Sequence, residues 1–138
     1  MSKAAQVKAP WLNSRDPEVP ATLTYSELSM CSRVEEMVRR YPDYIAYEFM
    51  GKCTTYAEMW KKINACAKSL KAIGIREGDK VTICMPNAPQ TLCMFYAVNM
   101  VGAIANMVHP LSAESEIAFY LRDSGSVAAI TLDQFYPK

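Results

Sequence analysis

The fold is decided by residues 80–108, KVTICMPNAPQTLCMFYAVNMVGAIANMV, in which Lys80 is the one charged side chain. Residues 80–85 are a short run rich in apolar and β-branched side chains, and residues 103–108 are another. Between them, residues 90–101 are apolar nearly all round. Turn-forming residues separate the three runs: Pro86, Asn87, Pro89 and Gly102. These lengths and breaks predict a buried strand, a buried helix and a second buried strand.

The same stretch raises the alternative of a membrane span, because residues 81–113 contain no Asp, Glu, Lys or Arg. A spanning helix needs about twenty consecutive apolar residues. Prolines, asparagines and a glycine interrupt the run too often for that, which favours the buried α/β interpretation and no transmembrane segment.

The pattern continues toward the carboxyl end. Ser112 is expected to cap a helix whose first turn holds Glu114 and Glu116, where the helix dipole favours negative charge. Asp123-Ser124-Gly125 should end that helix, and residues 127–132 form a third apolar run. The fold class predicted is therefore α/β, a parallel βαβαβ sheet unit with right-handed crossovers and helices on both faces.

Before this unit, helical spacing predicts a helix at Leu28, Cys31, Val34, Met37 and Val38. Residues 44–49 and 53–55 predict a short N-terminal hairpin. Thr55 and Glu58 match a capping box and open a helix that runs to Ile73. The apolar stripe expected along this helix is Met59, Trp60, Ile63, Cys66, Ala67, Leu70 and Ile73, with lysines mainly on the wetter side and Gly74 as a left-handed cap.

Two regions are expected overall. Residues 1–24 contain three prolines and little periodicity, so we expect an extended amino-terminal arm, and residues 25–138 form the folded part. The net charge of +1 gives no reason to expect nucleic acid or an anionic membrane as a partner. The five cysteines have no C-x-x-C spacing, which favours free thiols in a cytoplasmic protein over a disulfide scaffold.

Chemistry-bearing residues are sparse. Neither G-x-G-x-x-G nor G-x-x-x-x-G-K-S/T occurs, so no backbone phosphate cradle is predicted. His109, the only histidine, could be a base or ligand at the carboxyl end of a strand, with Cys84 and Cys93 as candidate thiol neighbours. Without a second histidine, a structural role in the loop before Ser112 is the favoured interpretation.

Other residues have two interpretations each. Glu77 and Asp79 could be paired carboxylates, but their place before a strand favours a solvated turn. The nine methionines could form an adaptable binding surface, and core packing is favoured. Tyr44, Tyr47 and Phe49 could form an aromatic platform, and a half-buried strand is favoured.

An ordered set of short motifs carries a family resemblance. The motifs are Thr55-Tyr56-Ala57-Glu58, Gly74-Ile75-Arg76-Glu77-Gly78-Asp79-Lys80-Val81, Met85-Pro86-Asn87, Gly102-Ala103-Ile104 and Leu121-Arg122-Asp123-Ser124-Gly125-Ser126. Over about residues 28–133 the chain resembles the early region of the adenylate-forming (AMP-binding) superfamily, which includes acyl-CoA synthetases, luciferases and peptide-synthetase adenylation domains. It looks most like the N-terminal part of a bacterial acyl-CoA synthetase, a fatty-acid– or aryl-CoA ligase.

The resemblance implies an incomplete part of the acyl-CoA synthetase N-terminal domain. The parent enzyme would be an AMP-forming acid–thiol ligase that uses ATP, Mg and CoA and passes through an acyl-adenylate. The family's phosphate loop, nucleotide contacts, hinge and catalytic lysine all come later than Lys138, so the resemblance assigns no catalytic, cofactor-binding or metal residue to this chain. A truncated chain, inactive alone, is the expectation.

Two alternatives remain open. The chain could be a stand-alone, non-catalytic α/β module that binds a nucleotide or an acyl carrier, or a non-catalytic subunit that completes a split enzyme. The expected partners are the remainder of the parent enzyme and, for that parent, a carboxylic acid and CoA. An uncovered sheet edge also predicts self-association.

Overall fold

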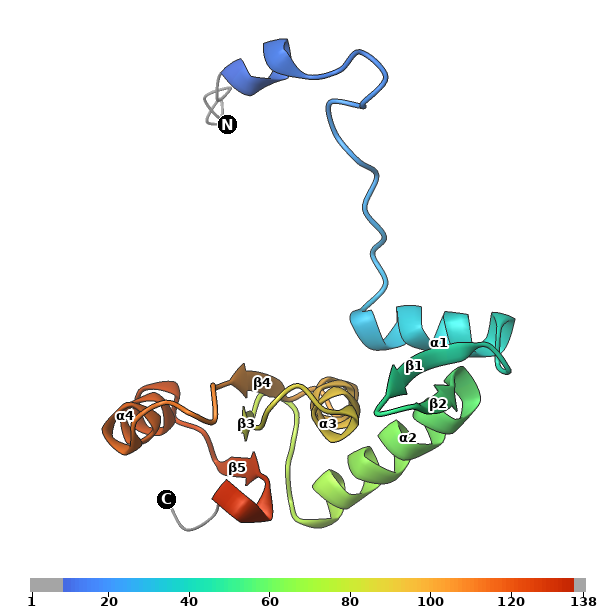
Figure 1. Ribbon diagram of the computed structural model, residues 1–138. Coiled ribbons are helices and arrows are strands. Elements are labelled where there is room, and N and C mark those ends of the chain that lie inside the picture. Colours follow the sequence, from blue (N-terminus) through green and yellow to red (C-terminus); the bar gives the residue numbers. More distant parts are fainter. Residues whose placement is uncertain (1–8, 136–138) are drawn as a thin grey trace.

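The computed structural model describes residues 9–135 and confirms the α/β class (Figure 1). A three-stranded parallel sheet has the order β4-β3-β5. Its strands are β3 (Lys80–Cys84), β4 (Ile104–Met107) and β5 (Ala128–Thr131). Helix α3 (Pro89–Met100) joins β3 to β4, and α4 (Glu114–Ser124) joins β4 to β5. The predicted βαβαβ unit is therefore present, with the first strand in the centre.

Different helices cover the two faces of this sheet. Val81 and Ile83 point into the main core with α2 (Tyr56–Ala72) and α3, and both have no exposed surface. Thr82 and Cys84 point to the opposite face, where α4 lies. Figure 1 shows α4 on the far side of the sheet from α2 and α3.

A polar network crosses the α4 face. The side-chain amide of Asn106 donates to Thr82 Oγ1 at 2.9 Å, and the hydroxyls of Thr82 and Ser126 lie 2.7 Å apart. Thr82 has no exposed surface, so these bonds replace the water that the hydroxyl loses on folding.

The expectation that all three strands are buried on both faces is correct only for β3. Residues 81–84 of β3 are all buried, but Ile104 and Met107 of β4 are 53% and 50% exposed. β4 and β5 are the edge strands of the sheet as described, and α4 has no buried residue. A strand's neighbours, which the sequence pattern does not specify, decide its burial.

The hairpin lies against α2, at the end of the molecule away from α4 (Figure 1). β1 (Ile45–Phe49) and β2 (Lys52–Thr55) pair antiparallel across a two-residue turn. Met50 and Gly51 both have positive φ, +51° and +76°, as a tight hairpin turn requires. The first long helix, α1 (Met30–Arg40), starts at the Ser29 cap, so Leu28 lies outside it and is exposed, contrary to the periodic pattern.

The capping box at the start of α2 is confirmed. Thr55 Oγ1 accepts from the Glu58 amide at 3.3 Å, and the Glu58 carboxylate accepts from the Thr55 amide at 3.0 Å. Ile73 was expected on the buried stripe but is 71% exposed. The helix ends at Ala72 and Gly74 turns the chain with φ +96°, which directs Ile73 outward.

The cap of α4 differs from the expectation. Ala113, not Ser112, is the residue before the helix, and the Glu116 carboxylate accepts from the Ala113 amide at 3.1 Å. The amide of Ser112 instead donates to the His109 carbonyl at 3.2 Å in a turn. Gly125 ends the helix with φ +63°, as predicted.

The remaining segments lie outside these layers. Residues 9–29 run away from the rest of the chain and include a short 3₁₀ helix, η1 (Pro10–Ser14) (Figure 1). The boundary between residues 24 and 25 stays a prediction. A second 3₁₀ turn, η2 (Asp133–Phe135), follows β5. None of the helices in residues 9–135 is long and apolar enough to cross a membrane.

Candidate functional site

The carboxyl edge of the parallel sheet is the first place to look for a site. The chain leaves β3 through α3 toward β4 on one side, and then crosses through α4 to β5 on the other side of β3. The direction of winding therefore reverses between β3 and β5. Open α/β sheets bind ligands outside the carboxyl ends of their strands at such a switch point.

Two loops form this edge. The loop after β3 holds Pro86 and ends at Pro89, the first residue of α3, and the Pro86 carbonyl accepts a 2.6 Å hydrogen bond from the buried Thr91 hydroxyl of α3. The loop after β4 begins with Val108, whose amide donates to the Ile83 carbonyl at 3.1 Å. The first loop is thus tied to α3, and the second is tied to β3.

His109 lies in the second loop and is exposed. Its Nδ1 accepts from the Leu111 amide at 3.2 Å, and its carbonyl accepts from Ser112. The imidazole therefore stabilises the turn before α4. Cys84 and Cys93, the suggested thiol neighbours, are separated by the sheet: Cys84 lines the α4 face, whereas Cys93 belongs to the core under α3.

Glu77 and Asp79 lie at the other end of the strands. Asp79 Oδ2 accepts from the Arg76 amide at 2.7 Å, which closes the turn that leads into β3. The aliphatic part of Glu77 lies directly beside Gly102. The structure therefore does not bring these carboxylates to His109.

Several positions in these loops lack a free donor for the nucleotide that the family resemblance implies, and no cluster of metal ligands accompanies them. A phosphate cradle needs several free backbone N–H groups. Pro86 in the first loop and Pro89 at the start of α3 lack that donor, and the amides of Leu111 and Ser112 are already bonded to His109. Within residues 9–135, no three His, Cys, Asp or Glu side chains are grouped to hold a metal ion.

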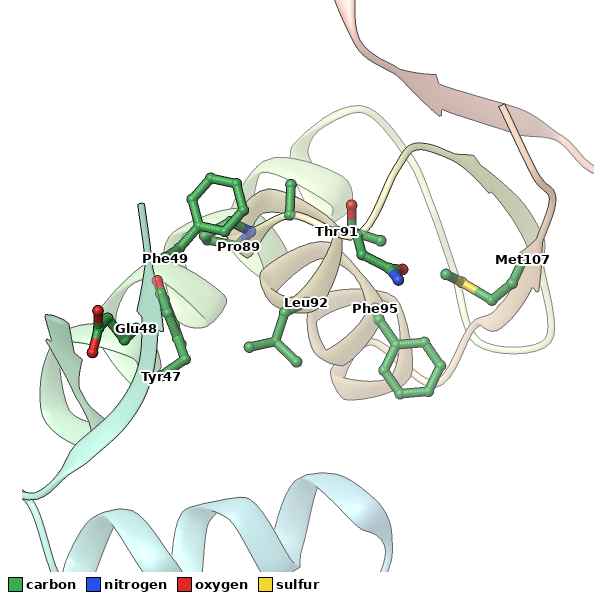
Figure 2. A pocket seen from close by; sticks show the side chains of 10 residues that line it. Tyr47, Glu48, Phe49, Pro89, Thr91, Leu92, Phe95 and Met107 are labelled. Atoms are coloured by element: carbon green, nitrogen blue, oxygen red, sulfur yellow. The ribbon is translucent and has the colours of Figure 1, made fainter. Parts of the chain in front are cut away.

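An apolar cavity of about 380 Å³ lies between the hairpin, α3 and β4. Figure 2 shows Tyr47 and Phe49 of β1 facing Pro89 and Leu92 of α3, with Glu48 turned away. Phe95 and Met107 lie toward the far end. Alternation along the strand explains this: residues 47 and 49 share a face and residue 48 has the other.

The aromatic and methionine predictions hold only in part. Tyr47 packs against the core as expected. Tyr44 precedes the strand and is 66% exposed, with its ring centre 5.0 Å from that of Tyr41. Met59 and Met85 are buried, whereas Met50 at the hairpin tip is 90% exposed. The packed residues Tyr47, Met59 and Met85 follow the periodicity of their strand or helix or of the strand end. Tyr44 and Met50 are exposed because they lie in turns beside β1.

A second cavity lies beside the first, between α2, α3 and the end of β5. Tyr47 and Pro89 line both cavities. The sequence did not reveal either one. The apolar sequence of α3 was the one signal that could have indicated these cavities. A helix that is apolar all round must contact apolar groups on more than the side that faces the sheet.

Comparisons with known proteins agree on one family. The sequence model described as "AMP-binding enzyme" matches residues 34–138. The long-chain-fatty-acid–CoA ligase of Bacillus subtilis (strain 168) is 32% identical over 133 residues, which are 96% of this chain and 24% of that protein. The chain therefore spans about a quarter of the length of this relative.

Solved structures give the same picture. A Mycobacterium tuberculosis fatty acyl CoA synthetase superposes with a TM-score of 0.74 at 33% identity, over 78% of this chain and 22% of that one. The N-terminal subdomain of Klebsiella oxytoca NpsA gives a TM-score of 0.72 at 27% identity, over 75% of this chain and 27% of that one. Both matches support the α/β fold described above.

Proposed function

The chain belongs to the AMP-binding enzyme family, and from that premise we propose that it forms the amino-terminal sheet unit of an AMP-forming fatty-acid–CoA ligase. The observation that carries the proposal is the family match over residues 34–138, which includes every strand of the parallel sheet. The Bacillus subtilis relative is named as a ligase of long-chain fatty acids, and we propose the same class of acid as the substrate of the whole enzyme.

We assign this unit a structural role. A ligase of this kind must hold the transferring phosphates with cations and backbone donors. At the carboxyl edge two prolines lack an N–H donor and two amides are bonded to His109. We therefore propose that the ATP, magnesium and CoA sites are built by other parts of the enzyme. The isolated chain should then catalyse neither adenylation nor thioester formation.

The surface of the sheet unit supports this assignment. The outer edges of β4 and β5 have no paired strand within residues 9–135. Large apolar side chains are exposed on β4 (Ile104 and Met107), in the loop after it (Leu111), on α4 (Phe119) and just before β5 (Val127). Exposed strand edges with apolar neighbours are normally covered by further protein. We propose that the remainder of the ligase covers them.

A chimera tests the proposal. Residues 34–138 replace the matching segment of the Bacillus subtilis ligase, and fatty-acid-dependent exchange of pyrophosphate into ATP is measured beside the unaltered ligase. Exchange within about tenfold of the parent supports the assignment, because about tenfold corresponds to only ~1.4 kcal/mol of barrier. A chimera that melts cooperatively yet is inert contradicts it. The same chimera with Ile83→Asp, a charge at a side chain with no exposed surface, should not fold.

The isolated chain separates the two alternatives. Calorimetry with ATP should show no binding, and micromolar binding would favour the stand-alone module. Restoration of exchange when the chain is mixed with a separately made carboxyl-terminal part would favour the split enzyme. We propose a cytoplasmic location, because none of the five cysteines, all of which lie within residues 9–135, is in a disulfide, as is usual in a reducing compartment.

A further inference from the structure

The cavity between α2, α3 and the end of β5 has a volume of about 460 Å³, and its wall is rich in sulfur. Among residues 9–135, four sulfur-bearing side chains line it: Cys66 of α2, Met85 just after β3, and Cys93 and Met94 of α3. We call it the sulfur cavity. β5 contributes none of these sulfur atoms, so the set stays intact when further protein covers the edge of β5.

The remaining ligand types on the wall narrow the choice of metal. No Asp, Glu or His of residues 9–135 lines the sulfur cavity. Magnesium and calcium ions need several oxygen ligands, and a structural zinc ion needs more thiolate or imidazole ligands than two cysteines supply. Thiolates and thioethers are soft ligands, and this combination selects Cu(I). The wall therefore offers what Cu(I) prefers and little that the harder ions prefer.

The charge on the wall also suits a monovalent soft ion. Cu(I) with two thiolates carries one net negative charge, which is unfavourable in an apolar cavity unless a cation accompanies it. Lys62 lines the same cavity and forms no salt bridge with a carboxylate among residues 9–135. Burial raises the pKa of the Cys93 thiol, Cys66 raises it further, and the Lys62 ammonium lowers it. The positive charge of Lys62 therefore acts on the sulfur atoms and balances the complex.

We propose that the sulfur cavity binds one Cu(I) ion through the thiolates of Cys66 and Cys93, with the thioethers of Met85 and Met94 as further ligands. Each thiol loses its proton on binding, so the ion replaces two protons and neither an oxidant nor a reductant takes part. Met85 and Cys93 are buried, whereas Cys66 and Met94 are half-buried and leave a path for the ion. This site goes beyond the ligase activity and does not rest on it.

Competition for Cu(I) tests the site. The reduced full chain is titrated, in the absence of oxygen, against the coloured complex of Cu(I) with bicinchoninate. We expect the chain to take up one Cu(I) ion. Burial is the main cause that raises the pKa of both Cys66 and Cys93, so both thiols hold their protons at pH ~7 before the metal binds. Binding should then release about two protons per ion into a weakly buffered solution.

Matched variants locate the ligands. Cys66→Ala should weaken Cu(I) binding by about 100-fold or more, because even the outer partners of a metal site are worth about 10–100-fold. Cys53→Ala removes the exposed thiol of β2 and should leave the affinity unchanged. Met94→Leu conserves volume but removes a thioether, and should weaken binding about tenfold. Met59→Leu alters a buried methionine of α2 that does not line the cavity, and should have no effect.

Circular dichroism before copper is added shows which variants are folded, and Cys66→Ser, which keeps the size of the side chain, replaces Cys66→Ala if the latter is not. Three results would each overturn the proposal: a chain that takes no Cu(I) from bicinchoninate, a folded Cys66 variant with undiminished affinity, or an equal loss in Cys53→Ala. The ligase proposal is tested separately, because pyrophosphate exchange by the chimera is measured without copper.

Discussion

Replacing Gly102 by alanine should destabilise this chain more than the same change at its other turn glycines. Gly102 joins α3 to β4 with φ +79°, and its carbonyl accepts from the Gly78 amide at 2.9 Å. An added Cβ would lie 2.9 Å from Cγ of Glu77, 3.1 Å from its Cβ and 3.4 Å from its Cα. The end of the Glu77 side chain can move, but its Cβ and Cα are fixed by the turn before β3.

The magnitude follows from three contributions. A positive φ costs an L-residue ~1–2 kcal/mol. The reduced freedom of the unfolded chain offsets ~0.4–1 kcal/mol of that. Crowding against Glu77 adds ~1–3 kcal/mol. We therefore expect Gly102→Ala to lower the free energy of unfolding by ~3 kcal/mol. Gly51→Ala has a similar φ of +76° but an open site, with nothing within 4 Å, so it should lose only ~1 kcal/mol.

Urea unfolding followed by far-ultraviolet circular dichroism measures both losses. The slope of the unfolding free energy against urea should stay unchanged, which shows that the midpoints report stability. Gly78→Ala, at φ +82° and also open, is a second control. Losses for Gly102→Ala and Gly51→Ala that agree within ~0.5 kcal/mol would refute the close approach of Glu77 as the cause.

Further predictions concern the cap of α2, the sheet, the Cys93 thiol and assembly. Thr55→Ala removes the cap of α2 and should cost ~1 kcal/mol in the same urea assay; no loss would mean that the cap is dispensable. Thr82→Val keeps the shape but leaves Asn106 without its acceptor, and should cost ~1–3 kcal/mol. Burial raises the pKa of Cys93, so it should react with maleimide more slowly than exposed Cys53 at pH 8. The folded state holds the Cys93 proton more tightly than the unfolded state does. The thiol should therefore stabilise the fold below its unfolded pKa and lose that effect as pH rises through the higher folded pKa; a Cys93→Ala variant should lack this loss. Sedimentation should show a dimer or larger species through the open strand edges, and a monomer at high concentration would count against this.

Local signals in the sequence predicted the local features well. The Thr55–Glu58 capping box, Gly125 at the end of α4 and the glycine after α2 all act within one turn of helix, so their neighbours along the chain suffice. The cap of α4 shows the limit of this reasoning. Ser112 is a better capping residue than Ala113, yet its amide is bonded to His109, and that turn shifts the helix start by one residue.

The candidate site depended on contacts far apart in sequence. The sequence predicts lysines mainly on the wetter side of α2, and Lys62 is exposed accordingly. Its position beside Tyr47 arises only because the hairpin folds against α2. The packing of α2 on α3 brings Cys66 and Cys93 to the wall of the cavity between α2, α3 and the end of β5. No spacing in the sequence indicates either contact.

The sequence by itself determined the order of the elements, the parallel βαβαβ unit and the family, because hydrophobic period, turn residues and short motifs are properties of consecutive residues. Only the tertiary structure decided that β3 is central, that β4 and β5 remain half exposed, and that an apolar cavity lies between α2, α3 and the end of β5. Burial and cavity shape depend on which distant segments pack together, and that packing is a property of the whole fold.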